Sequence, residues 1–96
     1  MKDLLELVRT YSNNIENGRD VAYIFEGLRE EVDELEAEVF GYDKGEDGIQ
    51  GEAVDVILCA LDLIYKAAPD WTNEDIVAYA EKKCEKWARK YHKGTQ

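Results

Sequence analysis

Two pairs of carboxylates stand at helical spacing in this chain, and 17 residues separate one pair from the other. The first pair is Glu31 and Glu34, and the second is Glu52 and Asp55. Because residues three apart project from the same side of a helix, each pair can present two carboxylates together. Antiparallel packing of the two helices would then gather four hard oxygen donors, the ligand type that Mg²⁺ prefers. The spacing therefore predicts a magnesium site.

The surroundings of Asp55 strengthen this prediction. Asp55 lies in an apolar run from Ala53 to Leu61. A carboxylate withdrawn from water is costly unless a cation or hydrogen bonds compensate it. No basic residue lies within one helical turn, so a metal ion is favoured over an internal salt bridge. The other acids of the region fit solvated helix faces, and a supporting role stays open for three residues: Glu30, Glu38 and Asp62.

The elements that must position these carboxylates are four predicted helices without a strand. Apolar residues at helical spacing and turn signals place them at 3–16, about 21–40, about 49–67 and about 73–91. Asn17-Gly18 ends the first helix, the glycine-rich segment 41–48 forms a loop, and Pro69 stops the third helix. Thr72 and Asp75 resemble a capping box. The sequence predicts an all-α fold with a single domain over residues 1–96.

The apolar patterns also predict which faces are buried. The third helix is apolar on most sides and is expected to be central. The second and fourth helices each carry one apolar stripe. The stripe of the second helix consists of Val21, Ile24, Phe25, Leu28, Val32, Leu35 and Val39. The stripe of the fourth helix consists of Ile76, Ala80, Cys84, Trp87 and Tyr91. A domain this small gains surface by assembling. We therefore expect a homo-oligomer whose interface uses the third or fourth helix.

Charge narrows the classes of partner. The net charge is −10, which argues against a nucleic-acid binder. Residues 81–96 hold six basic and two acidic residues, a net +4 that leaves −14 for the rest. An anionic substrate near the acidic helices would need metal cations to neutralise their field.

Other signals exclude several alternatives. No apolar run approaches the ~20 residues of a membrane span, and the N-terminus does not resemble a secretory signal. Cys59 and Cys84 fall at apolar helical positions without a CxxC pattern, which is typical of reduced thiols in the cytoplasm, although a disulfide between them stays open. Residues 43–54 do not fit an EF-hand, because Gly45 and Val54 stand at the third and twelfth positions, where carboxylates are expected. His92, the single histidine, fits a solvated position.

A family resemblance rests on two strings. Residues 28–35 read LREEVDEL and residues 51–57 read GEAVDVI, which together give the pattern EExxE followed by ExxD. This pattern, on these helices, resembles the MazG-like all-α nucleoside triphosphate pyrophosphohydrolases, and the likeness covers roughly residues 20–92. It implies a four-helix bundle-like fold completed by oligomerisation, as a homodimer or homotetramer. It also implies hydrolysis of a ribo- or deoxyribonucleoside triphosphate to monophosphate and pyrophosphate.

Carried over residue by residue, the resemblance makes Glu31, Glu34, Glu52 and Asp55 the metal ligands and catalytic residues. The expected cofactor is Mg²⁺, with Mn²⁺ as a substitute. Substrate contacts are expected from four residues, Lys83, Lys86, Arg89 and Trp71, while Tyr23 and Tyr42 are further candidates for base contact. A solvated helix face is the alternative for the three basic residues, and a staple against Ile76 is the alternative for Trp71.

Two other functions stay open. One is a non-enzymatic acidic helical adaptor, or a nucleic-acid mimic, that binds a basic partner. The other is a phosphoribosyl-ATP pyrophosphohydrolase, which belongs to the same class of enzyme. A pyrophosphate assay over a substrate panel distinguishes the three.

Overall fold

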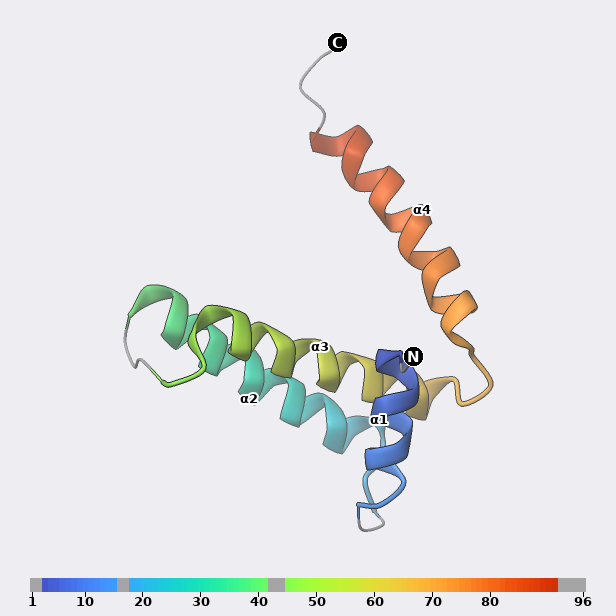
Figure 1. The fold of residues 1–96 in the computed structure, drawn as a ribbon, viewed down its shortest axis with the longest axis horizontal. Coiled ribbons are helices and arrows are strands. Elements are labelled where there is room, and N and C mark those ends of the chain that lie inside the picture. The colour runs from blue at the N-terminus through green and yellow to red at the C-terminus, as the bar shows by residue number, and fades with distance from the viewer. Residues whose placement is uncertain (1–2, 16–17, 42–44, 92–96) are drawn as a thin grey trace.

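The computed structural model describes residues 3–15, 18–41 and 45–91, and within these ranges it contains four α-helices and no strand (Figure 1). The helices are α1 (Leu4–Ser12), α2 (Val21–Phe40), α3 (Gly48–Ala67) and α4 (Asn73–Tyr91). This confirms the predicted all-α class. Asn17, Tyr42 and His92 lie outside the described residues.

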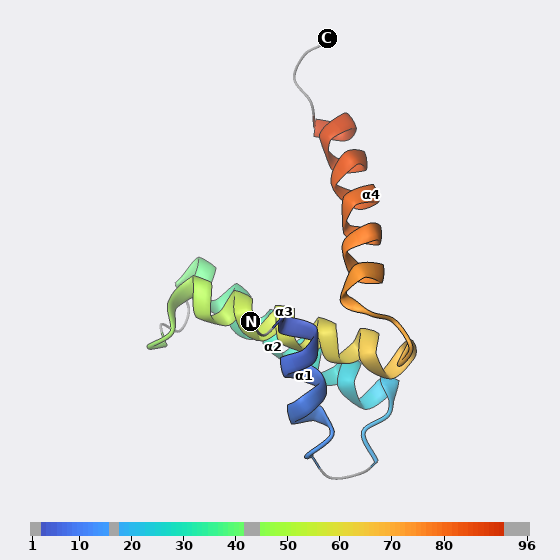
Figure 2. The same cartoon turned by 45° about the vertical axis from the view of Figure 1, so that its right-hand side comes forward.

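Helices α2 and α3 form an antiparallel hairpin, as Figures 1 and 2 both show. The Asp20 side chain caps α2 by accepting a hydrogen bond from the Tyr23 amide at 2.8 Å. Gly41 ends the helix in the left-handed region, at φ 77°, which a residue with a side chain rarely adopts. The predicted bounds of both helices are confirmed to within a residue or so.

Helix α3 is central, as predicted, because it packs against both α2 and α1. It ends at Ala67, two residues before Pro69. The residue that precedes a proline is driven out of the helical region, and Ala68 is accordingly non-helical at φ −141° and ψ 72°.

Helix α1 is shorter than predicted, since it ends at Ser12 rather than near residue 16. Polar contacts to α3 hold its last turn. The Ser12 hydroxyl donates to Asp62 at 2.8 Å, and the Tyr65 hydroxyl donates to Asn13 at 2.9 Å. The chain turns away after these contacts, so Ile15 is left half exposed instead of continuing the buried stripe.

Helix α4 stands apart from the other three helices within the single chain, so the four-helix bundle completed by oligomerisation stays a prediction. Its N-terminus forms the expected capping box, in which the Thr72 amide donates to Asp75 and the Asp75 amide to Thr72. Beyond this elbow, α4 projects away from the hairpin (Figures 1 and 2), and none of its residues is buried. Within the described part of the chain, four members of the stripe that was expected to face inward are exposed, and Ile76 is half-buried.

The apolar core of one chain is small. Among the described residues, the buried apolar side chains are Leu5, Val8 and Ile24. The α2 stripe is only partly covered, because four of its members are about half exposed: Val21, Phe25, Val32 and Val39. Among the described helices, α3 is the main neighbour of α2. No helix in the described part of the chain is both long and apolar enough to cross a membrane.

Candidate metal centre

Three of the four predicted ligands converge where α2 meets α3. Glu31 comes from α2, and Glu52 and Asp55 come from α3 at the i, i+3 spacing. One carboxylate oxygen of each lies within 4.8 Å of the others. Antiparallel packing of the two helices thus produces the predicted juxtaposition. All three residues are half-buried.

The electrostatics of this trio are uncompensated. One oxygen of Glu31 and one of Glu52 are buried without a hydrogen-bond partner among the described residues. Burial, and then the charges of Glu34 and Asp55, raise the pKa of Glu31 above its ordinary value. Burial and the same two charges also raise the pKa of Glu52. Unpaired buried carboxylate oxygens are costly, and a divalent cation is the ligand that would satisfy them together.

Glu34, the fourth predicted ligand, is exposed and lies outside the trio. It borders a hollow of about 370 Å³ next to the cluster, lined also by Ala37, Glu38, Gly45 and Glu52. Its negative charge contributes to the raised pKa of both Glu31 and Glu52. Glu34 is therefore placed beside the cluster, at the edge of this hollow.

The segment before α3 lies tightly against this hollow. The Gly45 amide donates to a carboxylate oxygen of Glu38 at 2.9 Å, which links the segment to α2. Gly51 directly precedes Glu52, and a Cβ at Gly51 would come within 2.3 Å of the Asp47 side chain. Only a glycine leaves room for this approach. Glu38, left open by the sequence, is thus a loop-holding residue in this structure.

The donor set fits a hard cation rather than zinc. Cys59 is one helical turn beyond Asp55 and is half-buried. Burial and the neighbouring charges of Glu31 and Asp55 raise the pKa of its thiol, and its sulfur is not among the ligand atoms that converge. The carboxylates that remain match the oxygen ligands of Mg²⁺ or Mn²⁺.

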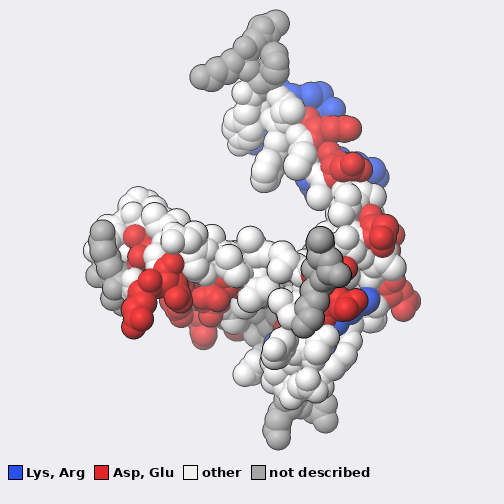
Figure 3. All heavy atoms as spheres, viewed as in Figure 1, with Lys and Arg blue, Asp and Glu red and all other residues white. Residues whose placement is uncertain are grey.

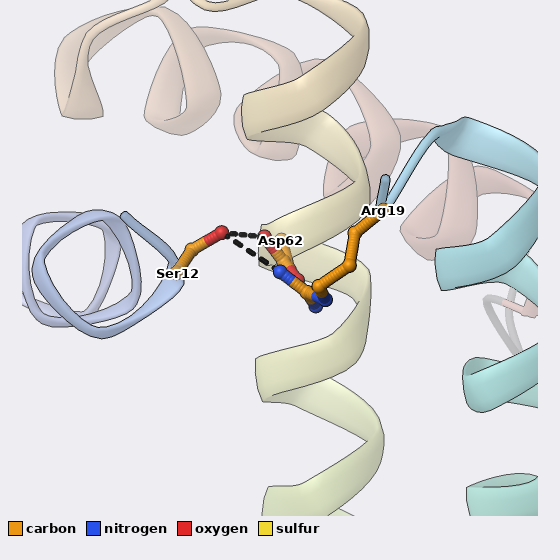
Figure 4. Close-up of polar contacts among 3 residues, drawn as sticks. All are labelled: Ser12, Arg19 and Asp62. Carbon is orange, nitrogen blue, oxygen red and sulfur yellow. Dashed lines mark hydrogen bonds and ion pairs between the residues drawn. The ribbon is translucent and has the colours of Figure 1, made fainter. Parts of the chain in front are cut away.

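The most buried acid of α3 is Asp62 rather than Asp55, which corrects the expectation for Asp55. Asp62 is paired with the Arg19 guanidinium and accepts from the Ser12 hydroxyl at 2.8 Å (Figure 4). Helix α1 packs against α3 and contributes Ser12 to this contact, whereas the residues that converge with Asp55 are Glu31 of α2 and Glu52 of α3. Asp62 is therefore a structural residue that ties three segments together, not a metal ligand.

The sequence did contain a signal for this contact. Asp62 follows Asp55 by seven residues, and Arg19 immediately precedes the Asp20 cap. A basic residue at the start of α2 lies opposite the end of α3 in an antiparallel hairpin. The search for a cation within one helical turn missed it because the partner comes from another segment.

The predicted substrate contacts do not join the carboxylates within one chain. Lys83, Lys86 and Arg89 are exposed on α4, which projects away from the hairpin. Trp71 lies in the elbow before α4, where its ring stacks on Tyr79 at a centroid distance of 4.9 Å. The staple against Ile76 stays a prediction. Figure 3 shows acids gathered along the hairpin, far from the basic side chains near the end of α4.

No family model, curated protein or solved structure matches the chain. The likeness to the MazG-like pyrophosphohydrolases therefore stays a prediction that rests on the two motif strings.

Proposed function

We propose that this protein is a Mg²⁺-dependent hydrolase that cleaves a nucleoside triphosphate between the α and β phosphates, releasing monophosphate and pyrophosphate. The observation that carries the proposal is the carboxylate trio of Glu31, Glu52 and Asp55, in which two buried oxygens have no partner among the described residues. The motif resemblance supplies the reaction. The resemblance also leads us to propose a homodimer or homotetramer.

Each carboxylate has a distinct role in this proposal. Glu31, Glu52 and Asp55 would hold the metal, because their oxygens converge. When bound, Mg²⁺ neutralises phosphate charge and makes a water molecule more acidic. Glu34 lies outside the trio at the edge of the hollow, so we assign to its carboxylate the acceptance of the proton from the attacking water.

An apolar pocket adjoining the cluster supports a substrate with an apolar or aromatic group. Leu7, Val8, Tyr11 and Leu58 contribute to a pocket of about 340 Å³ between α1 and α3. Small-molecule pockets commonly have volumes of roughly 300–1,000 Å³. Cys59 lines this pocket and is also close enough to Glu31 and Asp55 to feel their charge. A triphosphate at the carboxylates could thus place its base in this pocket.

A substrate panel tests the proposal. The purified chain is incubated with ribo- and deoxyribonucleoside triphosphates and with phosphoribosyl-ATP, in Mg²⁺ and then in excess chelator. We expect pyrophosphate from at least one triphosphate, and only with metal. Orthophosphate as the first product, or activity that survives chelation, contradicts the proposal. Turnover of phosphoribosyl-ATP alone assigns the third function, and no turnover at all favours the acidic adaptor.

A further inference from the structure

The pocket between α1 and α3 contains polar side chains, but these are paired with one another. Ser12 and Asp62 both line this pocket of about 340 Å³. The Ser12 hydroxyl donates to one carboxylate oxygen of Asp62 at 2.8 Å. The Arg19 guanidinium donates to the other oxygen and, at 3.2 Å, to the Ser12 hydroxyl (Figure 4). A hydroxyl has a single proton to donate, and Asp62 accepts it here.

The same polar groups are also withdrawn from the interior of the pocket. Ser12 is 5% exposed and Asp62 is 7% exposed, so little of either residue is open to a bound molecule. Tyr11, another lining residue with a hydroxyl, is 65% exposed and therefore belongs to the rim. Leu7 and Leu58 contribute apolar lining. A hydrogen-bonding group buried against such a surface is left unpaired, which costs free energy.

Contacts outside the pocket hold α1 in place beside α3. One guanidinium nitrogen of Arg9 donates to the backbone carbonyls of Pro69, at 2.8 Å, and Trp71, at 2.6 Å. The Arg9 guanidinium also lies 5.2 Å from the centre of the Tyr65 ring, and the Tyr65 hydroxyl donates to Asn13 at 2.9 Å. These contacts fix one wall of the pocket before any ligand binds. A pre-organised wall discriminates by shape, because adapting to a poorer fit would break them.

Cys59 joins the pocket to the carboxylate cluster. It lines the pocket, and after burial the charges of Glu31 and Asp55 are the main causes of the raised pKa of its thiol. At about 1.5 Å per residue, Asp62 lies roughly 10 Å beyond Asp55 along α3, with Cys59 between them. In a nucleotide, the sugar likewise stands between the base and the phosphates. A triphosphate held at the cluster therefore has its base at the pocket.

We propose that the pocket between α1 and α3 selects triphosphates by the apolar bulk of the base, and that it does not recognise the hydrogen-bonding edge of the base. The preferred substrate class is then a nucleotide with an alkyl group on a ring carbon, such as a 5-methylpyrimidine nucleotide. This inference rests on the proposed function for the position of the phosphates, and it adds which bases are preferred.

Four deoxynucleotides separate apolar bulk from the hydrogen-bonding edge. Deoxyuridine and thymidine triphosphates differ by one methyl group, as do deoxycytidine triphosphate and its 5-methyl derivative, whereas the two pairs differ from each other in the edge. Each is used as its α,β-imido analogue, which resists cleavage at that bond. Calorimetry with the full chain in Mg²⁺ measures the dissociation constants. We expect the methyl group to tighten binding about fourfold in both pairs, and the change of edge to alter binding less than about twofold.

Matched leucines of α3 test the lining. Leu58 lines the pocket, and Leu63 is also half-buried but lies outside the lining. Asparagine has nearly the shape of leucine and carries an amide. Leu58→Asn should abolish the preference for the methyl group, and Leu63→Asn should retain it. Leu7→Asn repeats the test from α1. A ratio of two dissociation constants does not depend on the folded fraction, so reduced stability alone cannot produce this difference.

A preference for one edge that exceeds the preference for the methyl group overturns the inference. So does a methyl preference that survives both Leu58→Asn and Leu7→Asn. Failure of the proposed function gives a different result, in which the analogues bind with the methyl preference but the parent triphosphates release no pyrophosphate. That result supports the pocket and contradicts the hydrolase. The absence of binding by all four analogues overturns both.

Discussion

The two aspartates of α3, Asp55 and Asp62, share one side of the helix but have opposite surroundings. At Asp62 the chain provides both compensating groups, the Ser12 hydroxyl and the Arg19 guanidinium. Asp55 instead lies beside two other carboxylates, those of Glu31 and Glu52. The first arrangement serves the stability of the fold. The second leaves negative charge to be compensated by something bound, which is the property of a site.

The largest effect is expected at the structural aspartate. Asp62→Asn leaves the part-buried Arg19 guanidinium without its counter-charge, and breaking a fully buried pair costs about 3–5 kcal/mol, which is the upper bound here. We expect the urea midpoint of unfolding to fall accordingly. The matched control is Asp55→Asn, the same substitution on the same side of the same helix, which should not destabilise the metal-free protein. Similar losses in both variants would remove the distinction between the two aspartates.

The next largest effect is expected on turnover. Glu31→Gln and Glu52→Gln each remove one carboxylate of the trio. We expect the rate of pyrophosphate release to fall at least about 100-fold in each variant. This loss exceeds the ~10–100-fold loss that typically follows removal of a residue that only hydrogen-bonds to a metal ligand. The fold should survive, because a buried oxygen of each side chain has no hydrogen-bond partner among the described residues. Glu36→Gln is the control, since Glu36 is exposed on α2. Equal losses in all three variants would mean that general acidity matters rather than a site.

A smaller effect is expected from pH. The pKa values of Glu31 and Glu52 are raised above the ordinary 4.5, so the folded protein keeps protons that the unfolded chain releases. The free energy of unfolding of the metal-free protein should therefore decline as pH rises from about 4.5 through the raised pKa values. Glu31→Gln should flatten this decline. Urea melts across pH 4 to 8 measure this decline in both proteins. If the free energy of unfolding of wild type rises with pH more steeply than that of Glu31→Gln, the raised pKa values of the carboxylate trio are contradicted.

Much of the fold could be predicted from local signals. The Asp20 cap, the Thr72–Asp75 box and Pro69 act within a few residues, so the sequence marks the starts of α2 and α4 and the end of α3. The end of α1 could not be predicted, because contacts with α3, 50 residues away at Ser12 and Asp62, determine it. The direction of α4 depends on a similarly distant contact, from Arg9 to Pro69.

Some residues of the candidate site could also be predicted from the sequence, and others could not. Glu31, Glu52 and Asp55 could be predicted, since helical spacing fixes each pair and antiparallel packing is the common arrangement of a helical hairpin. The buried partner of Asp62 could not be predicted from the helix alone, because Arg19 lies 43 residues away. Helical periodicity likewise identified the apolar stripe of α4 but not what covers it. A stripe shows only that a helix needs a partner, and that partner can belong to another molecule.

The most direct test of the metal centre is a pair of thermal melts, with and without Mg²⁺, on wild type and Asp55→Asn. Cation binding to the folded state alone stabilises by mass action, about 2.7 kcal/mol at a hundredfold excess over the dissociation constant. We predict a clear Mg²⁺-dependent rise in the melting temperature of wild type. Asp55→Asn should be at least as stable without metal and should respond to Mg²⁺ far less. Equal Mg²⁺ responses, or marked destabilisation of metal-free Asp55→Asn, would show that Asp55 is a structural residue like Asp62 and would contradict the metal centre.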